Sequence, residues 1–114
     1  MGYRSEVYLG VDKEIIEKLL TYAGLNPNAY KMLFEYTEYA KKAENGGLLF
    51  YWDHVKWYDS YPDVRIIQEF IMDDEHHEQV KFLRLGESYD DIEEVGGSDN
   101  FYFEVDRQVV VHIE

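Results

Sequence analysis

The residues best suited to chemistry lie in the run DDEHHEQ, residues 73–79, where carboxylates and imidazoles stand together. Both groups are ligands for zinc, iron or manganese. If a helix continued through this run, Asp73, His76 and His77 would share one face, because helical residues three and four apart are neighbours. The run lacks the HExxH pattern and any calcium-loop spacing, and an acidic, solvated helix end has the same composition. We therefore expect no metal and no other cofactor.

His54 is a second candidate, as a general base inside an aromatic strand expected at residues 48–58. Successive strand residues point to opposite faces, so Asp53 should lie on the other face and could not orient His54 as a catalytic acid does. The chain has no cysteine and no G-x-S-x-G elbow. We predict a protein without catalytic residues. The alternative is a metal-dependent hydrolase that uses His76 and His77.

The chain also lacks the glycine-rich turn between strand and helix that binds phosphates. Aromatic side chains could still stack a base while arginines hold its phosphate. The arginines are Arg4, Arg65, Arg84 and Arg107. A small-molecule binder that sequesters a nucleotide is therefore the alternative to a protein-binding function.

The segment GESYDDIEEVGGSDN, residues 86–100, carries acidic side chains and no basic one. Such runs are usually solvated loops. Carboxylates spaced along a rigid hairpin can also imitate the phosphates of a nucleic acid and occupy a basic groove, with an aromatic residue as anchor. On this hypothesis, the residues that bind the partner are Glu87, Tyr89, Asp90, Asp91, Glu93 and Glu94.

The net charge of −13 is unevenly distributed along the chain. Residues 1–57 hold eight acids and seven bases, a net charge of −1, whereas residues 58–114 hold sixteen acids and four bases, a net charge of −12. Affinity for nucleic acids comes mainly from Lys and Arg at the phosphates, so we expect no direct binding to DNA or RNA. The expected partner is a protein with a basic groove.

The length of 114 residues suits one domain, and a hydrophobic content of 46% supports a folded core. Without cysteine there are no disulfides. No apolar run approaches the ~20 residues that span a bilayer. The opening MGYRSEVYLG lacks the basic-then-apolar order of a signal peptide. We expect no membrane association and a cytoplasmic location.

The elements that must position these residues follow from apolar periodicity. Residues 3–11 suit a strand, and a helix should begin after Asp12 and end at Gly24, with the apolar residues Ile15, Ile16, Leu19, Leu20 and Ala23 at helical spacing. A second helix is predicted from Asn26-Pro27 to about residue 44. Its apolar residues form two neighbouring stripes, which must be covered from two sides or face a partner; a homodimer could cover them. These residues are Tyr30, Leu33, Phe34 and Thr37, then Met32, Tyr36, Tyr39 and Ala43.

In the strand expected at 48–58, Leu48, Phe50 and Trp52 should face the helices, with Trp57 on the opposite face. Ser60 has the spacing of a capping box for a third helix. Further strands are expected at 80–85, 92–95, 101–106 and 108–113, the last two forming either a hairpin at Asp106-Arg107 or one bent strand. Together the elements predict one α+β domain over residues 1–114. Three helices should pack on one face of a mainly antiparallel sheet of about five strands.

Three stretches resemble a family of small, largely uncharacterised bacteriophage proteins that open with Met-Gly-Tyr-Arg-Ser. They are residues 2–7, the Trp-x-x-x-Lys-Trp-Tyr-x-x-Tyr-Pro stretch at 52–62, and the aromatic strand and acidic run at 82–95. The resemblance carries no catalytic or binding residue. It implies a phage protein in the host cytoplasm that binds and inhibits a host protein, such as a restriction or CRISPR complex. A virion or assembly component is the alternative.

Overall fold

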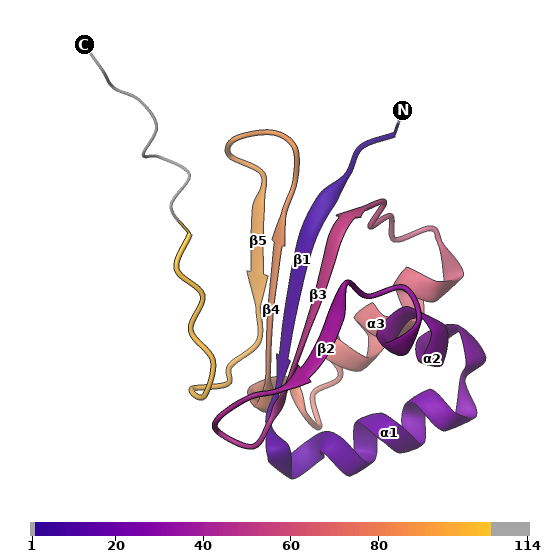
Figure 1. Ribbon diagram of the computed structural model, residues 1–114, viewed down its shortest axis with the longest axis vertical. Helices are drawn as coiled ribbons and strands as arrows, with labels where there is room; N and C mark the ends of the chain where they lie inside the picture. Colours follow the sequence, from indigo (N-terminus) through magenta and orange to yellow (C-terminus); the bar gives the residue numbers. More distant parts are fainter. Residues whose placement is uncertain (1, 106–114) are drawn as a thin grey trace.

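The computed structural model describes residues 2–105, which form a five-stranded antiparallel sheet with three α-helices against one face (Figure 1). The strand order is β2-β3-β1-β4-β5. This confirms the predicted α+β class. The strands are β1 (Ser5–Val11), β2 (Tyr39–Lys42), β3 (Leu48–Val55), β4 (Val80–Leu85) and β5 (Ile92–Val95), and the helices are α1 (Ile16–Leu25), α2 (Pro27–Phe34) and α3 (Pro62–Met72).

The hydrophobic core lies between the helices and the sheet face that they cover, here called the inner face. Val7, Leu9 and Val11 of β1 alternate onto this face and are at most 1% exposed. Trp52 and Phe50 of β3 lie opposite Val7 and Leu9, and their burial confirms the prediction that they face the helices. Burial of each large apolar side chain stabilises the fold by about 1.5–3 kcal/mol. The helices contribute Leu19, Ala23, Ala29, Met32, Leu33, Val64, Ile67, Phe70 and Ile71.

The first helix forms where it was expected, but both of its ends differ in detail. A 3₁₀ turn, Lys13–Ile15, precedes α1. Asp12 makes no capping hydrogen bond; its carboxylate accepts one from the Ser98 hydroxyl at 2.6 Å. The predicted end at Gly24 is wrong, since α1 runs to Leu25. Proline disfavours helical backbone in the residue before it, so Pro27 places Asn26 in an extended conformation and ends the helix there.

The predicted second helix is wrong beyond Phe34, where α2 ends. Residues 39–42 form β2, which pairs with β3 and places Tyr39 opposite Tyr51. Gly46, with a φ of 90°, supplies the left-handed residue of the connecting turn. Pairing with β3 satisfies backbone groups that local propensity had assigned to a helix. Of the two predicted stripes, Met32 and Leu33 are buried, whereas Tyr30, Phe34 and Tyr36 are exposed.

The third helix begins at Pro62 with Tyr61 in the N-cap position, so the predicted capping box at Ser60 does not form. No side chain caps this end; Asp63 Oδ1 accepts a hydrogen bond from the Val64 amide at 2.9 Å. A proline at the first helical position suffices to start the helix, because its fixed φ suits a helix and its missing N–H would have had no partner there.

Strand β3 contains a β-bulge at its end, which changes the side-chain directions predicted for it. Ser5 pairs with Val55 but Val7 pairs with Trp52, so β3 carries one residue more than β1 over this interval. His54, in the bulge, has a φ of 53°. Trp57 was predicted on the face opposite Trp52, which is wrong. It is buried in the core, with its ring centroid 5.1 Å from that of Trp52.

The chain after β5 crosses the outer face, the side of the sheet away from the helices (Figure 1). Phe101 packs over Gly10, and the Phe103 ring lies 5.7 Å from the Tyr8 ring. Residues 101–105 form no strand, contrary to the prediction for 101–106. Their aromatic side chains cover the sheet instead of extending its ladder. The strand predicted at 108–113, and the turn before it, lie outside the described residues.

Candidate functional site

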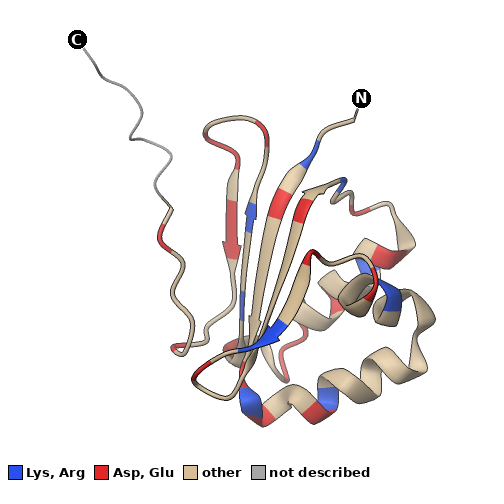
Figure 2. Ribbon diagram, in the orientation of Figure 1, with Lys and Arg blue, Asp and Glu red and all other residues tan. Residues whose placement is uncertain are grey.

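The acidic segment predicted to bind a partner is the hairpin that joins β4 to β5, and it extends beyond the sheet at the end opposite α1 (Figure 2). Its backbone forms a compact turn, in which the Gly86 amide donates to the Asp91 carbonyl at 2.9 Å and the Asp91 amide to the Ser88 carbonyl at 3.0 Å. Basic residues on β4 face acidic residues on β5 across the strand pair (Figure 2).

Arg84 binds two of the six predicted partner residues. Its Nη2 lies 2.8 Å from Asp91 Oδ1, and its Nε lies 3.0 Å from Glu93 Oε1. The hydrogen bond that Arg84 donates to Asp91 is the largest cause that raises the pKa of Arg84 above its ordinary value. Asp91 also accepts a hydrogen bond from the Tyr3 hydroxyl at 2.6 Å. Asp91 and Glu93 therefore hold the hairpin together.

The N-terminal residues brace the same hairpin. The Arg4 amide donates to Glu87 Oε2 at 2.7 Å, and the Ser88 amide donates to the Tyr3 hydroxyl at 3.0 Å. The Tyr3 amide in turn donates to the Tyr58 hydroxyl at 2.7 Å. Segments more than eighty residues apart in the sequence thus fix the turn. Sequence reasoning missed this brace, since Tyr3 and Arg4 carry no local signal that they contact residues 87–91.

The remaining predicted residues face solvent. Alternation along β5 exposes Ile92 and Glu94 while Glu93 and Val95 are half-buried. Glu94 lies 3.9 Å from Lys81. Asp90 is exposed at the tip, beside Tyr89, of which 60% is exposed. The structure therefore separates the six residues into a pair bound by Arg84 and an exposed, outward set, which consists of Glu87, Tyr89, Asp90 and Glu94. Of this outward set, Glu87 also accepts the hydrogen bond from the Arg4 amide.

A cluster of tyrosines occupies the outer face of the sheet. The Tyr51 ring lies 4.7 Å from that of Tyr8 and 5.3 Å from that of Tyr39. Burial, then the negative charge of Glu6, raises the pKa of Tyr51 above its ordinary value. The same two causes raise the pKa of Tyr8. This face is therefore aromatic and acidic at once.

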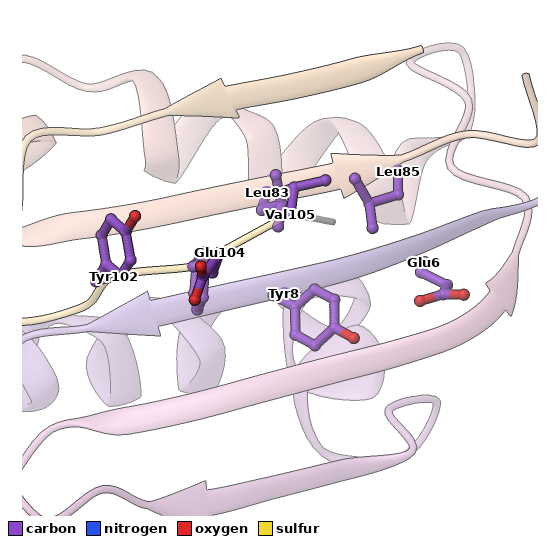
Figure 3. Close-up of a pocket in the computed structure, with 8 residues that line it drawn as sticks. Glu6, Tyr8, Leu83, Leu85, Tyr102, Glu104 and Val105 are labelled. Atoms are coloured by element: carbon purple, nitrogen blue, oxygen red, sulfur yellow. The ribbon is translucent and has the colours of Figure 1, made fainter. Parts of the chain in front are cut away.

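A pocket of about 480 Å³ lies between this face and the segment after β5. Figure 3 shows Glu6 and Tyr8 of β1 on one side of the chain that carries Tyr102 and Glu104, and Leu83 of β4 on the other side, beside Val105. Its described lining includes two glutamates and no basic side chain. Such a pocket suits an aromatic or cationic group better than the phosphates of a nucleotide. Of the four arginines considered for holding the phosphate of a nucleotide, Arg84 is bound to acidic side chains, and Arg107 lies outside the described residues.

The bulge in β3 brings His54 and Asp53 together, which alternation had excluded. His54 Nδ1 lies 3.5 Å from Asp53 Oδ1, although strict alternation predicted the two side chains on opposite faces. The His54 side chain is 82% exposed. An imidazole in open water lacks the desolvated, preorganised surroundings that general-base catalysis uses. The contact by itself supports no catalytic role.

The run at 73–79 does not continue α3, so the predicted helical face of Asp73, His76 and His77 does not form. The helix ends at Met72, and Asp73 has extended backbone. His77 Nδ1 lies 3.3 Å from the Ile71 carbonyl oxygen. The fold gathers a different set, Asp73, Glu75 and His76, whose ligand-type atoms all lie within 4.8 Å of one another.

Comparison with protein-family models, curated proteins and solved structures finds no match to this chain. Among the described residues, no helix combines the length and the apolar character needed to cross a membrane.

Proposed function

We propose that the protein binds a basic surface of another protein through the outward set on the β4–β5 hairpin. The observation that supports this most directly is Tyr89, 60% exposed beside the acidic Asp90 on a turn held by Arg84, Tyr3 and Arg4. A braced turn loses little conformational entropy on binding. It presents an aromatic group of the kind that dominates binding energy, surrounded by charges that select a basic partner.

The charge distribution favours a protein partner over a nucleic acid. The acidic residues of the second half repel phosphates and attract lysine- and arginine-rich grooves over a distance set by the ionic strength. Proteins that handle nucleic acids carry such grooves. The resemblance to phage proteins suggests the biological setting. There the protein would be a non-enzymatic inhibitor that occupies the groove of a host restriction or CRISPR complex.

Affinity capture tests the proposal. Tagged protein is incubated with a bacterial host lysate at low and at high salt, and the retained proteins are identified by mass spectrometry. We expect a nucleic-acid-handling complex to be retained at low salt and released at high salt, since exposed charge pairs are screened. Retention of no protein at either salt would contradict the proposal.

Variants then locate the surface. Asp90→Lys with Glu94→Lys should weaken binding at least tenfold, and Tyr89→Ala by about 2 kcal/mol, roughly thirtyfold. Asp91 and Glu93 are left intact because their loss would loosen the turn. Glu44→Lys is the matched control, a charge reversal at an exposed residue of the β2–β3 connection. Equal affinities for the control and the hairpin variants would exclude this surface.

A further inference from the structure

Three side chains, those of Asp73, Glu75 and His76, converge at the end of α3. The sequence had grouped Asp73 and His76 with His77 and had not included Glu75. Ligand-type atoms of Asp73, Glu75 and His76 lie within 4.8 Å of one another. The turn after the helix causes this. Asp73 Oδ1 accepts a hydrogen bond from the Glu75 amide at 2.9 Å, and the Asp73 carbonyl accepts one from the His76 amide at 3.2 Å. The chain therefore folds back within three residues and directs the carboxylates and the imidazole to one place.

His76 supplies an independent observation. It is only 4% exposed, and its ring stacks on that of Phe70 with centroids 3.9 Å apart. Its Nε2 bonds to the Phe70 carbonyl oxygen, which can only accept, so Nε2 carries the proton. In the neutral ring Nδ1 then holds a lone pair. That atom is buried and has no hydrogen-bond partner among the described residues.

A buried acceptor without a partner costs about 1–3 kcal/mol, so a native protein rarely keeps one without a use. The arrangement of His76 is the one found at metal sites. There the imidazole donates one N–H to a backbone carbonyl, which fixes the tautomer, and offers its other nitrogen to the metal.

The electrostatic surroundings also favour a cation. The C-terminus of a helix carries partial negative charge, and the last turn of α3 contains no basic residue to balance it. The three residues border a surface groove of about 720 Å³, whose lining includes Glu14, Glu17 and Glu69. Lys18 Nζ lies 3.0 Å from Glu75 Oε1, so a cation already neutralises one of the carboxylates.

We propose that Asp73, Glu75 and His76 bind a divalent transition-metal ion of the zinc class, with water completing the coordination. The imidazole favours zinc, cobalt or nickel over calcium and magnesium, which prefer oxygen ligands. Bonds of 2.0–2.1 Å place tetrahedral ligands roughly 3.3 Å apart, so the separations between the ligand atoms must shorten by up to about 1.5 Å, by movement of the two exposed carboxylates. Lys18 competes with the metal for Glu75.

Titration of the untagged full chain with Zn²⁺ in a calorimeter tests the site. We expect one ion per chain. Asp73→Asn and Glu75→Gln should each weaken binding at least about tenfold, since even loss of an outer hydrogen bond to a ligand costs 10–100-fold. Asp74→Asn is the matched control, an adjacent exposed acid outside the cluster, and should bind as the original chain does.

Lys18→Gln distinguishes a specific metal site from non-specific binding of metal to acidic residues. Removal of the competing ammonium group should tighten Zn²⁺ binding, whereas a chain that collects metal through general acidity would gain little. Because His76 is buried and its replacement could unfold the chain, its role is read in the original sequence, from ring ¹⁵N shifts in NMR spectra. We expect Nδ1 to shift on addition of Zn²⁺. Three results would each overturn the proposal. They are Zn²⁺ affinity unchanged by Glu75→Gln, His76 ring ¹⁵N shifts unchanged by Zn²⁺, and a titration that does not saturate up to about 1 mM Zn²⁺.

Discussion

At the residue scale, Arg84 determines how much of the acidic hairpin can face a partner. Its guanidinium bonds to Asp91, Glu93 and the Ser5 hydroxyl, and its side chain is only 17% exposed. A planar guanidinium with five donors can satisfy several acceptors at once, which an ammonium group cannot. Two acids of the predicted binding set are therefore structural because one arginine lies opposite them.

Replacement of this arginine tests that division of roles. Arg84→Met keeps the aliphatic packing but leaves Asp91 and Glu93 close together without their cation. We expect the free energy of unfolding to fall by about 2 kcal/mol, below the 3–5 kcal/mol of a fully buried pair because the carboxylates are partly solvated. Urea denaturation measures this. Arg65→Met, on the exposed surface of α3, is the control, and an equal loss there would contradict the assigned role.

The outer-face tyrosines give a prediction about pH. Burial and the Glu6 carboxylate raise the pKa of Tyr51 and Tyr8 above the ordinary value of 10.0. The unfolded chain therefore loses these protons first, and the stability they contribute is complete below pH 10 and is lost as the pH rises toward the folded pKa. The free energy of unfolding should decline above about pH 10, and less steeply in Tyr51→Phe. Urea denaturation across this pH range measures both slopes, and identical slopes would contradict the prediction.

At the scale of the elements, the bulge of β3 redirects the chain into the core. The extra residue near His54 ends the alternation that would have kept Trp57 outside, and Trp57 then packs on Trp52. The same residue takes a left-handed backbone, with a φ of 53°, which side chains other than glycine rarely adopt. The bulge is therefore a structural device whose backbone strain the surrounding packing must offset.

His54→Gly should relieve that strain. We expect the free energy of unfolding to rise by about 0.5–1 kcal/mol, since glycine adopts positive φ without steric cost and the lost His54 side chain is exposed. His54→Val should lower it by about 1 kcal/mol or more, because a β-branched residue is least tolerant of this conformation. Thermal and urea denaturation of both variants measure the difference. A more stable valine variant would show that the bulge is not strained.

At the scale of the whole molecule, the two faces of the sheet are covered differently. Three helices cover the inner face, whereas the segment at 101–105 runs along the outer face (Figure 1). On that outer face, Phe103 of the segment contacts Tyr8 of the tyrosine cluster. Hydrogen bonds at its start position this covering segment. The Ser98 hydroxyl donates to Asp12, and Asn45 donates to the Asn100 carbonyl at 2.7 Å. The segment at 98–105 thus forms a second layer on the side of the sheet away from the helices.

Gly10→Val should displace that layer. A Cβ at Gly10 would overlap the Phe101 ring, so the segment must move away from the sheet. We expect the amides of Ser98 and Asn100, which donate to the Val80 carbonyl and the Ser98 hydroxyl, to lose protection in hydrogen exchange while β1 and β3 keep theirs. Gly24→Ala is the control, because nothing lies within 4 Å of the added methyl in α1, and it should stabilise the helix by up to about 1 kcal/mol. Unchanged protection of the Ser98 and Asn100 amides in Gly10→Val would show that Phe101 does not hold the segment.

The sequence by itself determined the α+β class, the bounds of β4 and β5, and the presence of α1 and α3. These features follow from local signals, because the spacing of apolar residues and the positions of prolines depend only on the residues within one helix or strand. It also located the acidic hairpin and the charge asymmetry, which are properties of composition.

Only the tertiary structure decided which residues of 26–44 are helix and which are strand, where Trp57 points, and which acids are available. Residues 39–42 became β2 because the edge of β3 offered backbone partners. Arg84 divided the acidic set because β4 and β5 pair in one register. Asp73, Glu75 and His76 met because α3 ends at Met72. In each case the deciding contact joins groups whose proximity depends on where strands pair or a helix stops, and local periodicity does not encode that.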